Sequence, residues 1–118
     1  MKKRTASQNG RRSRAKGAAF EREVAIIFRN VFPDARRRLE NHKDDANGVD
    51  LMNTGRFKIQ CKKLKDWAPV GRIKEITLEE GDIPVLITAG DNKPAMAVLP
   101  LEDFMDLVGM FYQMKAGA

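Results

Sequence analysis

The stretch from Arg56 to Lys62 alternates between apolar and polar side chains over a length that suits one β-strand. Successive side chains of a strand point to opposite faces, so Phe57, Ile59 and Cys61 share one face, which is apolar. The residues between them form a polar face. The pattern therefore predicts a strand that packs against a core on one side and presents a row of polar groups on the other.

The rest of the chain predicts three helices and four further strands. Helical spacing of apolar residues favours helices at about 15–31, 67–80 and 101–114. The first of these stops before Pro33, which cannot continue a helix. Residues 35–40 are expected to form a basic strand, and apolar runs bounded by turn residues predict strands at 48–52, 83–89 and 95–99. The resulting order, αβββαββα, indicates an α/β fold in which helices flank a central mixed sheet.

Length and composition favour a single intracellular domain. The chain has 118 residues, and we expect residues 15–118 to form one domain. It has neither a run of about 18 apolar residues nor a secretory signal, which predicts a soluble cytoplasmic protein, nucleoid-associated or in a phage-infected host. The one cysteine, Cys61, lies on the apolar strand face and is expected to be an inert core thiol.

Basic residues are concentrated at the N-terminus. Residues 1–16 hold seven Lys and Arg and no acidic residue, whereas the whole chain has a net charge of +6. Because this segment has few apolar side chains, we expect residues 1–14 to be a flexible basic arm. A solubilising tail and a nucleic-acid contact are both open, and phosphate neutralisation favours the second. The residues expected to make that contact are Arg11, Arg12, Arg14 and Lys16.

One acidic residue lies on the core-facing side of the first helix. At about 100° per residue, Glu21 falls close to Val24, Ala25 and Phe28, whereas Glu23 lies nearly opposite. A buried carboxylate without a partner is costly, so we expect Glu21 to meet a metal ion or another cation. A salt bridge to a nearby arginine is the alternative.

Polar side chains on two neighbouring strands suit the hydrolysis of a phosphodiester. If the strands at 48–52 and 56–62 are adjacent, Asp50 lies beside Gln60 and Lys62. A hard divalent cation can activate water and neutralise a phosphate, and Mg²⁺ prefers oxygen ligands. The candidate ligands are Asp50, Glu21, the side-chain oxygen of Gln60 and the backbone carbonyl of Cys61, with Mn²⁺ as a substitute metal.

Lys62 has several open roles beside such a site. It can orient or deprotonate the attacking water, or stabilise the charge on the phosphorus centre. Each residue also has a simpler reading, in which Asp50 caps a turn and Lys62 belongs to a solvated basic edge.

Four segments, in this order, resemble motifs of the PD-(D/E)xK nuclease superfamily, and within it the archaeal-type Holliday junction resolvases. Residues 16–23 (KGAAFERE) are similar to the first-helix motif K-G-x-x-x-E-R-E, and residues 48–51 (GVDL) to the aspartate strand. Residues 60–62 (QCK) are similar to the E-x-K strand, and residues 81–86 (GDIPVL) to the start of a later strand. Gln60 stands where the resolvases usually carry glutamate, although Q-x-K variants occur in related nucleases.

The resemblance implies a restriction-endonuclease-like sandwich and a magnesium-dependent endonuclease that resolves four-way DNA junctions as a homodimer. It places the catalytic residues at Glu21, Asp50, Gln60 and Lys62. Methionines on the last helix, beyond those that one core face needs, are consistent with a dimer contact. Basic residues expected to hold DNA phosphates, besides the arm, are Arg22, Arg36, Arg37, Arg38, Lys43, Lys63 and Lys65.

Three alternatives stay open from the sequence. The chain can be a nuclease of the same type that acts on flaps, nicks or duplex DNA. It can be a nucleic-acid-binding module of the same fold that lost activity when Gln60 replaced an acidic ligand. A structural or ribosome-associated basic protein is the third, and it gives no reason for Glu21 to face inward.

Overall fold

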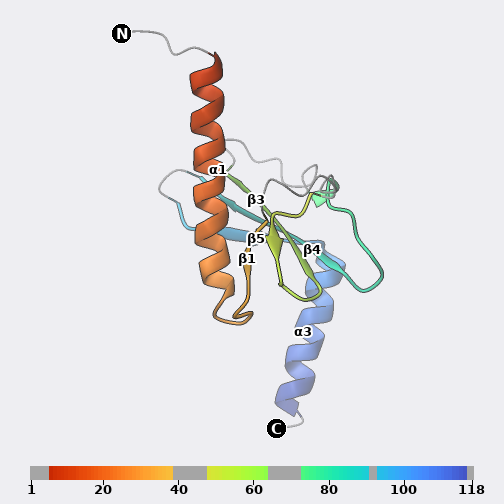
Figure 1. Cartoon of the computed structure of the whole chain (residues 1–118). Coiled ribbons are helices and arrows are strands. Elements are labelled where there is room, and N and C mark those ends of the chain that lie inside the picture. The colour runs from red at the N-terminus through yellow and green to blue at the C-terminus, as the bar shows by residue number, and fades with distance from the viewer. Residues whose placement is uncertain (1–5, 39–47, 64–72, 91–92, 117–118) are drawn as a thin grey trace.

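The computed structural model describes residues 6–38, 48–63, 73–90 and 93–116, and the fold is given for these ranges. They form an α/β structure with two helices and two small sheets (Figure 1). The elements in chain order are α1 (Ala6–Phe28), β1 (Arg36–Arg37), β2 (Leu51–Met52), β3 (Phe57–Lys63), β4 (Ile83–Ala89), β5 (Met96–Val98) and α3 (Leu101–Ala116).

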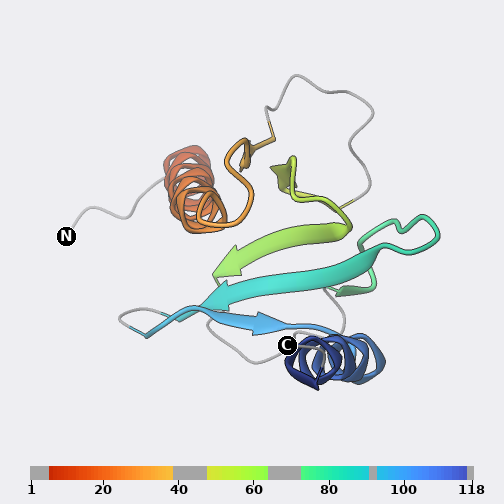
Figure 2. The same ribbon diagram turned by 90° about the horizontal axis from the view of Figure 1, so that it is seen from below.

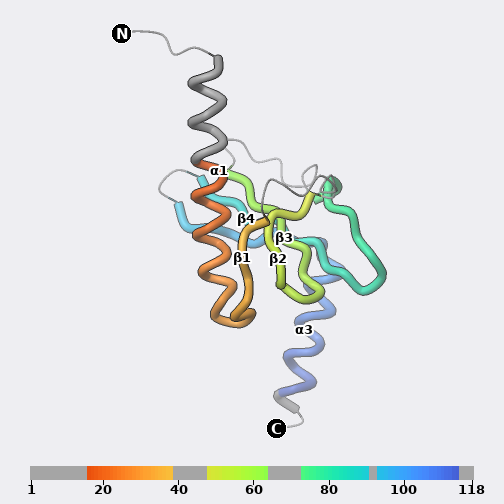
Figure 3. Tube along the Cα trace, in the orientation of Figure 1, coloured from red at the N-terminus to blue at the C-terminus, as the bar shows by residue number. Residues whose placement is uncertain are grey.

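The larger sheet has the strand order β3-β4-β5 and is mixed. β3 and β4 are parallel, with Cys61 opposite Ile87, whereas β4 and β5 are antiparallel. The smaller sheet is an antiparallel ribbon of β1 and β2, with Arg37 opposite Leu51. The ribbon lies next to β3, where the Asp50 N–H donates to the carbonyl of Ile59 at 2.8 Å (Figure 3). The mixed α/β class expected from the sequence is confirmed.

The core lies between α1 and the face of β3 and β4 that carries their odd-numbered residues. Ile59 is fully buried there, and Val24 and Ala25 of α1 are 2% and 1% exposed. All seven residues of β4 are buried, and this strand is the central one of the three. Figure 2 looks nearly along both helices and shows α1 beside β1 and β3, and α3 beside β5.

The observed elements differ from the expected ones at β1 and at three further places. β1 covers Arg36–Arg37 rather than 35–40, and residues 39–40 lie outside the described ranges. α1 begins at Ala6 rather than near residue 15, so residues 6–14, expected to be a flexible arm, continue the helix. Strand β2 begins at Leu51 rather than at Gly48, because Gly48 has a φ of 74°, which an extended strand does not allow. Of the helix expected at 67–80, residues 67–72 lie outside the described ranges, and in 73–80 only Ile73 is helical.

Helix α3 makes little contact with the sheet. Leu107 packs against the core, while apolar side chains on several sides of the helix are 48–76% exposed: Leu101, Phe104, Met105, Met110, Phe111, Tyr112 and Met114. Figure 1 shows α3 extending away from the sheet. None of the helices in the described part of the chain combines the length and apolar character needed to cross a membrane.

Candidate active site

Glu21 lies at the edge of the buried side of α1. Its neighbour Phe20 is 5% exposed, and the Glu21 side chain is 20% exposed, whereas Glu23 faces outward. The inward position predicted from helical spacing is therefore confirmed. Its cationic partner in the structure is Arg37 of β1, whose Nε lies 3.3 Å from Glu21 Oε2. The arginine alternative considered from the sequence thus describes the contact observed.

Asp50 is held by backbone on both sides just before β2. Its N–H donates to Ile59, and its carbonyl accepts from the Arg38 N–H, both at 2.8 Å. Its carboxyl Oδ2 accepts a 2.8 Å hydrogen bond from the N–H of Cys61. Asp50 therefore reaches β3 as expected, but its hydrogen-bond partner there is the backbone of Cys61 and not a side chain.

Opposing effects act on the pKa of the Asp50 carboxyl group. Burial raises the pKa of this carboxyl group above its usual value. The Cys61 N–H and the positive charges of Lys62, Arg38 and Arg37 act in the other direction. Loss of hydration favours pairing of the Asp50 carboxylate with a cation, and the neighbouring Lys62, Arg38 and Arg37 already supply positive charge.

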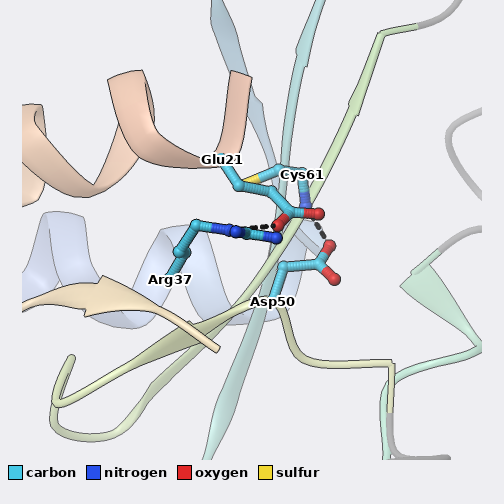
Figure 4. Close-up of polar contacts among 4 residues, drawn as sticks. All are labelled: Glu21, Arg37, Asp50 and Cys61. Carbon is cyan, nitrogen blue, oxygen red and sulfur yellow. Dashed lines mark hydrogen bonds and ion pairs between the residues drawn. The ribbon is translucent and has the colours of Figure 1, made fainter. Parts of the chain in front are cut away.

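The two carboxyl groups meet beside the backbone of Cys61. Figure 4 shows the side chains of Glu21 and Asp50 turned toward the same small region, with the Arg37 guanidinium next to Glu21. Both carboxylates, together with burial as the largest cause, raise the pKa of the Cys61 thiol. The thiol stays protonated at neutral pH, which agrees with the expected inert core cysteine.

The backbone carbonyl of Cys61 lies on the same side of β3 as Asp50. A residue in an extended strand directs its N–H and C=O toward the same strand edge, and the Cys61 N–H points at Asp50. The carbonyl predicted as a ligand is thus turned toward the carboxyl groups and away from β4.

Gln60 occupies the other face of β3 and is 6% exposed. Its Nε2 donates a 3.0 Å hydrogen bond to Oε2 of Glu75. Its Oε1 is also buried and, among the described residues, accepts no hydrogen bond. Such an atom costs about 1–3 kcal/mol when it is left unsatisfied, so this position favours a bound water molecule or cation.

Glu75 is a residue near the site that the sequence did not indicate. It lies in the segment 73–80, which was expected to be helical, and no spacing rule connects it to a strand fifteen residues earlier. The only sequence signal was an acidic residue between the apolar positions Ile73 and Ile76. Its contact with Gln60 depends on the connection between two parallel strands.

The basic residues named from the sequence differ in position and exposure. Lys62 and Lys63 are exposed at the end of β3, and the Lys63 Nζ lies 5.7 Å from the centre of the Phe20 ring. Lys16, Arg22 and Arg36 are exposed, whereas Arg37 and Arg38 are half-buried. Arg11, Arg12 and Arg14 lie in the N-terminal part of α1, and Lys43 and Lys65 are outside the described ranges.

Three oxygen donors turned toward one region fit a cation that keeps part of its water shell. Within the described ranges, no three His, Cys, Asp or Glu side chains are arranged to hold a metal ion. The donors that converge are the Glu21 and Asp50 carboxylates and the Cys61 carbonyl, whereas the buried Gln60 Oε1 lies on the other face of β3. Because Mg²⁺ usually takes only one or two carboxylates from protein, this set is compatible with it.

The comparisons with known proteins found no counterpart for this geometry. No protein-family model matches the chain, and no curated protein or solved structure matches it. The function is therefore inferred from the residues of the site and from their arrangement.

Proposed function

We propose that this chain is a magnesium-dependent endodeoxyribonuclease with a restriction-endonuclease-like fold, and that it cuts four-way DNA junctions. The observation that carries the proposal is the convergence of the Glu21 and Asp50 carboxyl groups beside β3 (Figure 4). The resemblance of four motifs to the junction resolvases, in the same order, supports the choice of reaction and substrate.

Glu21 and Asp50 would hold the divalent ion, with Gln60 Oε1 and the Cys61 carbonyl as further oxygen donors. When bound, the ion neutralises charge on the phosphate and lowers the pKa of the attacking water. Arg37 keeps the Glu21 side chain directed toward the site through their 3.3 Å contact. It also competes with the ion for that carboxylate, which favours a modest metal affinity.

Lys62 supplies a positive charge that acts on Asp50. Its side chain is exposed, and its charge lowers the pKa of Asp50, so it acts within electrostatic reach of that carboxylate. In the proposed reaction its ammonium group orients the attacking water or stabilises negative charge on the phosphate. The exposed Lys63 and Arg36 would contact neighbouring phosphates.

A second function is favoured by two specific features. Arg37 already neutralises Glu21, and Gln60 carries no charge, so the site has less negative charge than three carboxylates would provide. Both features would suit a nucleic-acid-binding module of this fold without catalysis. Such a protein would bind a junction in the presence of a chelator and leave it intact when Mg²⁺ is added.

Substrate choice is tested with labelled DNAs of identical sequence. We expect cleavage of a four-way junction to be at least about tenfold faster than cleavage of a flap, a nicked duplex or a linear duplex, the smallest ratio that we would call selective. Single-turnover rates with Mg²⁺ measure this preference. A faster rate on flaps or linear duplex would still support a nuclease, but it would show that the four-way junction is not the preferred substrate.

We also propose that the protein is a homodimer in which α3 packs against α3 of a second copy. The apolar side chains of α3 are largely exposed, and a 16-residue helix gains little stability in water without packing. A two-fold contact between identical helices would cover both surfaces at once. It would also provide two active sites for the two strands that a symmetric junction presents.

The dimer is tested by a charge placed on α3. We expect the wild-type protein to sediment with twice the mass of one chain, and Met110→Glu to shift it to the monomer. Met110 is 48% exposed, so the change should not disturb the monomer fold. Gln113→Glu adds the same charge at another exposed position of α3 and serves as the control. A wild-type monomer at micromolar concentration would refute the dimer.

A further inference from the structure

The hydrogen bond between Gln60 and Glu75 determines how the Gln60 amide is oriented. The Nε2 of Gln60 lies 3.0 Å from Oε2 of Glu75. An ionised carboxylate only accepts hydrogen bonds, so the amide must present its NH₂ group to it. Turning the amide over would place two oxygen atoms in contact. The Gln60 Oε1 is therefore directed away from Glu75.

Glu75 is held in place by the segment that leads to Asp50. The backbone of Gly48 passes so close that an added Cβ would lie 2.6 Å from the Glu75 carbonyl oxygen. Ile76, the next residue, is 6% exposed and anchors the segment. Glu75 thus contacts both the Gly48 backbone, two residues before Asp50, and the side chain of Gln60 on β3.

The orientation leaves an oxygen atom that suits a ligand. Gln60 is 6% exposed, and within the described ranges its Oε1 accepts no hydrogen bond. Buried polar atoms are nearly always paired. Glu75 does not join Glu21 and Asp50 in a group of three acidic side chains compact enough for one ion. The observed contact through which Glu75 can act on a ligand atom is its hydrogen bond to Gln60.

We propose that Glu75 and Gln60 act as a carboxylate–amide pair that replaces a single carboxylate on β3. Gln60 Oε1 is the ligand atom, and Glu75 is a positioning residue that orients the amide and increases the negative charge on its oxygen. The arrangement parallels the carboxylates that orient metal-binding histidines from behind. This inference rests on the metal site of the proposed function and adds a residue to it.

Manganese titration without DNA tests the pair directly. Calorimetry should show that Glu75→Gln weakens Mn²⁺ binding about tenfold, the lower end of the effect known for such supporting residues. The exchanged pair Gln60→Glu/Glu75→Gln keeps the hydrogen bond and the net charge, so it should bind at least as tightly as the wild type. Glu80→Gln removes an exposed carboxylate from the same segment and should change nothing.

The possible outcomes separate this inference from the proposed function. If Glu75→Gln binds Mn²⁺ as tightly as the wild type while Asp50→Asn loses binding, the role of the Glu75–Gln60 pair is wrong. The metal site itself would still be supported. Absence of Mn²⁺ binding by the wild type would overturn both. Thermal melting of each variant shows whether a loss comes from unfolding. Weakened binding that the exchanged pair fails to restore, in a folded protein, would also contradict the pair.

Discussion

Asp50→Asn should abolish cleavage of a four-way junction while leaving its binding intact. The substitution keeps an oxygen atom that can accept the Cys61 N–H bond but removes the charge that would hold the metal ion. We expect the single-turnover rate with Mg²⁺ to fall by at least about 10²–10³-fold, as when one electrostatic contact of a transition state is lost. Gel-shift affinity in a chelator should not fall, because Asp50 itself repels phosphate and its charge contributes nothing to DNA binding without metal.

The matched control for this experiment is Glu80→Gln, which removes one negative charge from an exposed position. It should cleave at the wild-type rate. Glu21→Gln should resemble Asp50→Asn, because both carboxylates turn toward the same region (Figure 4). Wild-type cleavage by Asp50→Asn would remove the candidate site from the reaction.

Neutralising the arm should reduce both DNA affinity and its dependence on salt. Figure 1 shows the N-terminal turns of α1 extending beyond the sheet, and Arg11, Arg12 and Arg14 belong to this part. Replacing all three by Gln keeps good helix-forming residues. Each lost phosphate contact should lower the slope of log K against log salt by about 0.9, up to roughly 2.7 for the three.

Binding isotherms of a junction at several salt concentrations measure this slope. Lys58→Gln removes a positive charge at the opposite end of β3 from Lys62 and should leave the slope unchanged. Affinity at about 0.1 M salt should fall by an order of magnitude or more in the triple variant, because these contacts supply sequence-independent affinity. A slope equal to that of the wild type would show that the arm does not touch phosphate.

Elements with strong periodicity were predictable from the sequence. β3 and β4 carry uninterrupted strand patterns, and α3 has apolar residues at helical spacing, so their positions are close to those expected. The start of α1 was not predictable, because residues 6–14 contain almost no apolar position to indicate a helix face. The shortened β2 results from the left-handed conformation of Gly48, which the sequence shows only as a glycine.

The sequence predicted which residues belong to the candidate site better than it predicted their contacts. Helical geometry placed Glu21 inward, and strand order brought Asp50 to β3. Their observed partners, Arg37 and the Cys61 N–H, depend on how the β1–β2 ribbon lies against β3. The Gln60–Glu75 contact joins β3 to a residue within the connection between β3 and β4, and no local pattern indicates such a pair.

The most direct test of a metal-dependent nuclease is single-turnover cleavage of a labelled four-way junction by the wild-type protein with Mg²⁺ and with a chelator. We predict two symmetric cuts on opposing strands with Mg²⁺ and an intact junction with the chelator. A junction that is bound, as a gel shift would show, but still intact after prolonged incubation with Mg²⁺ or Mn²⁺ would contradict the nuclease. It would identify the chain as a DNA-binding module.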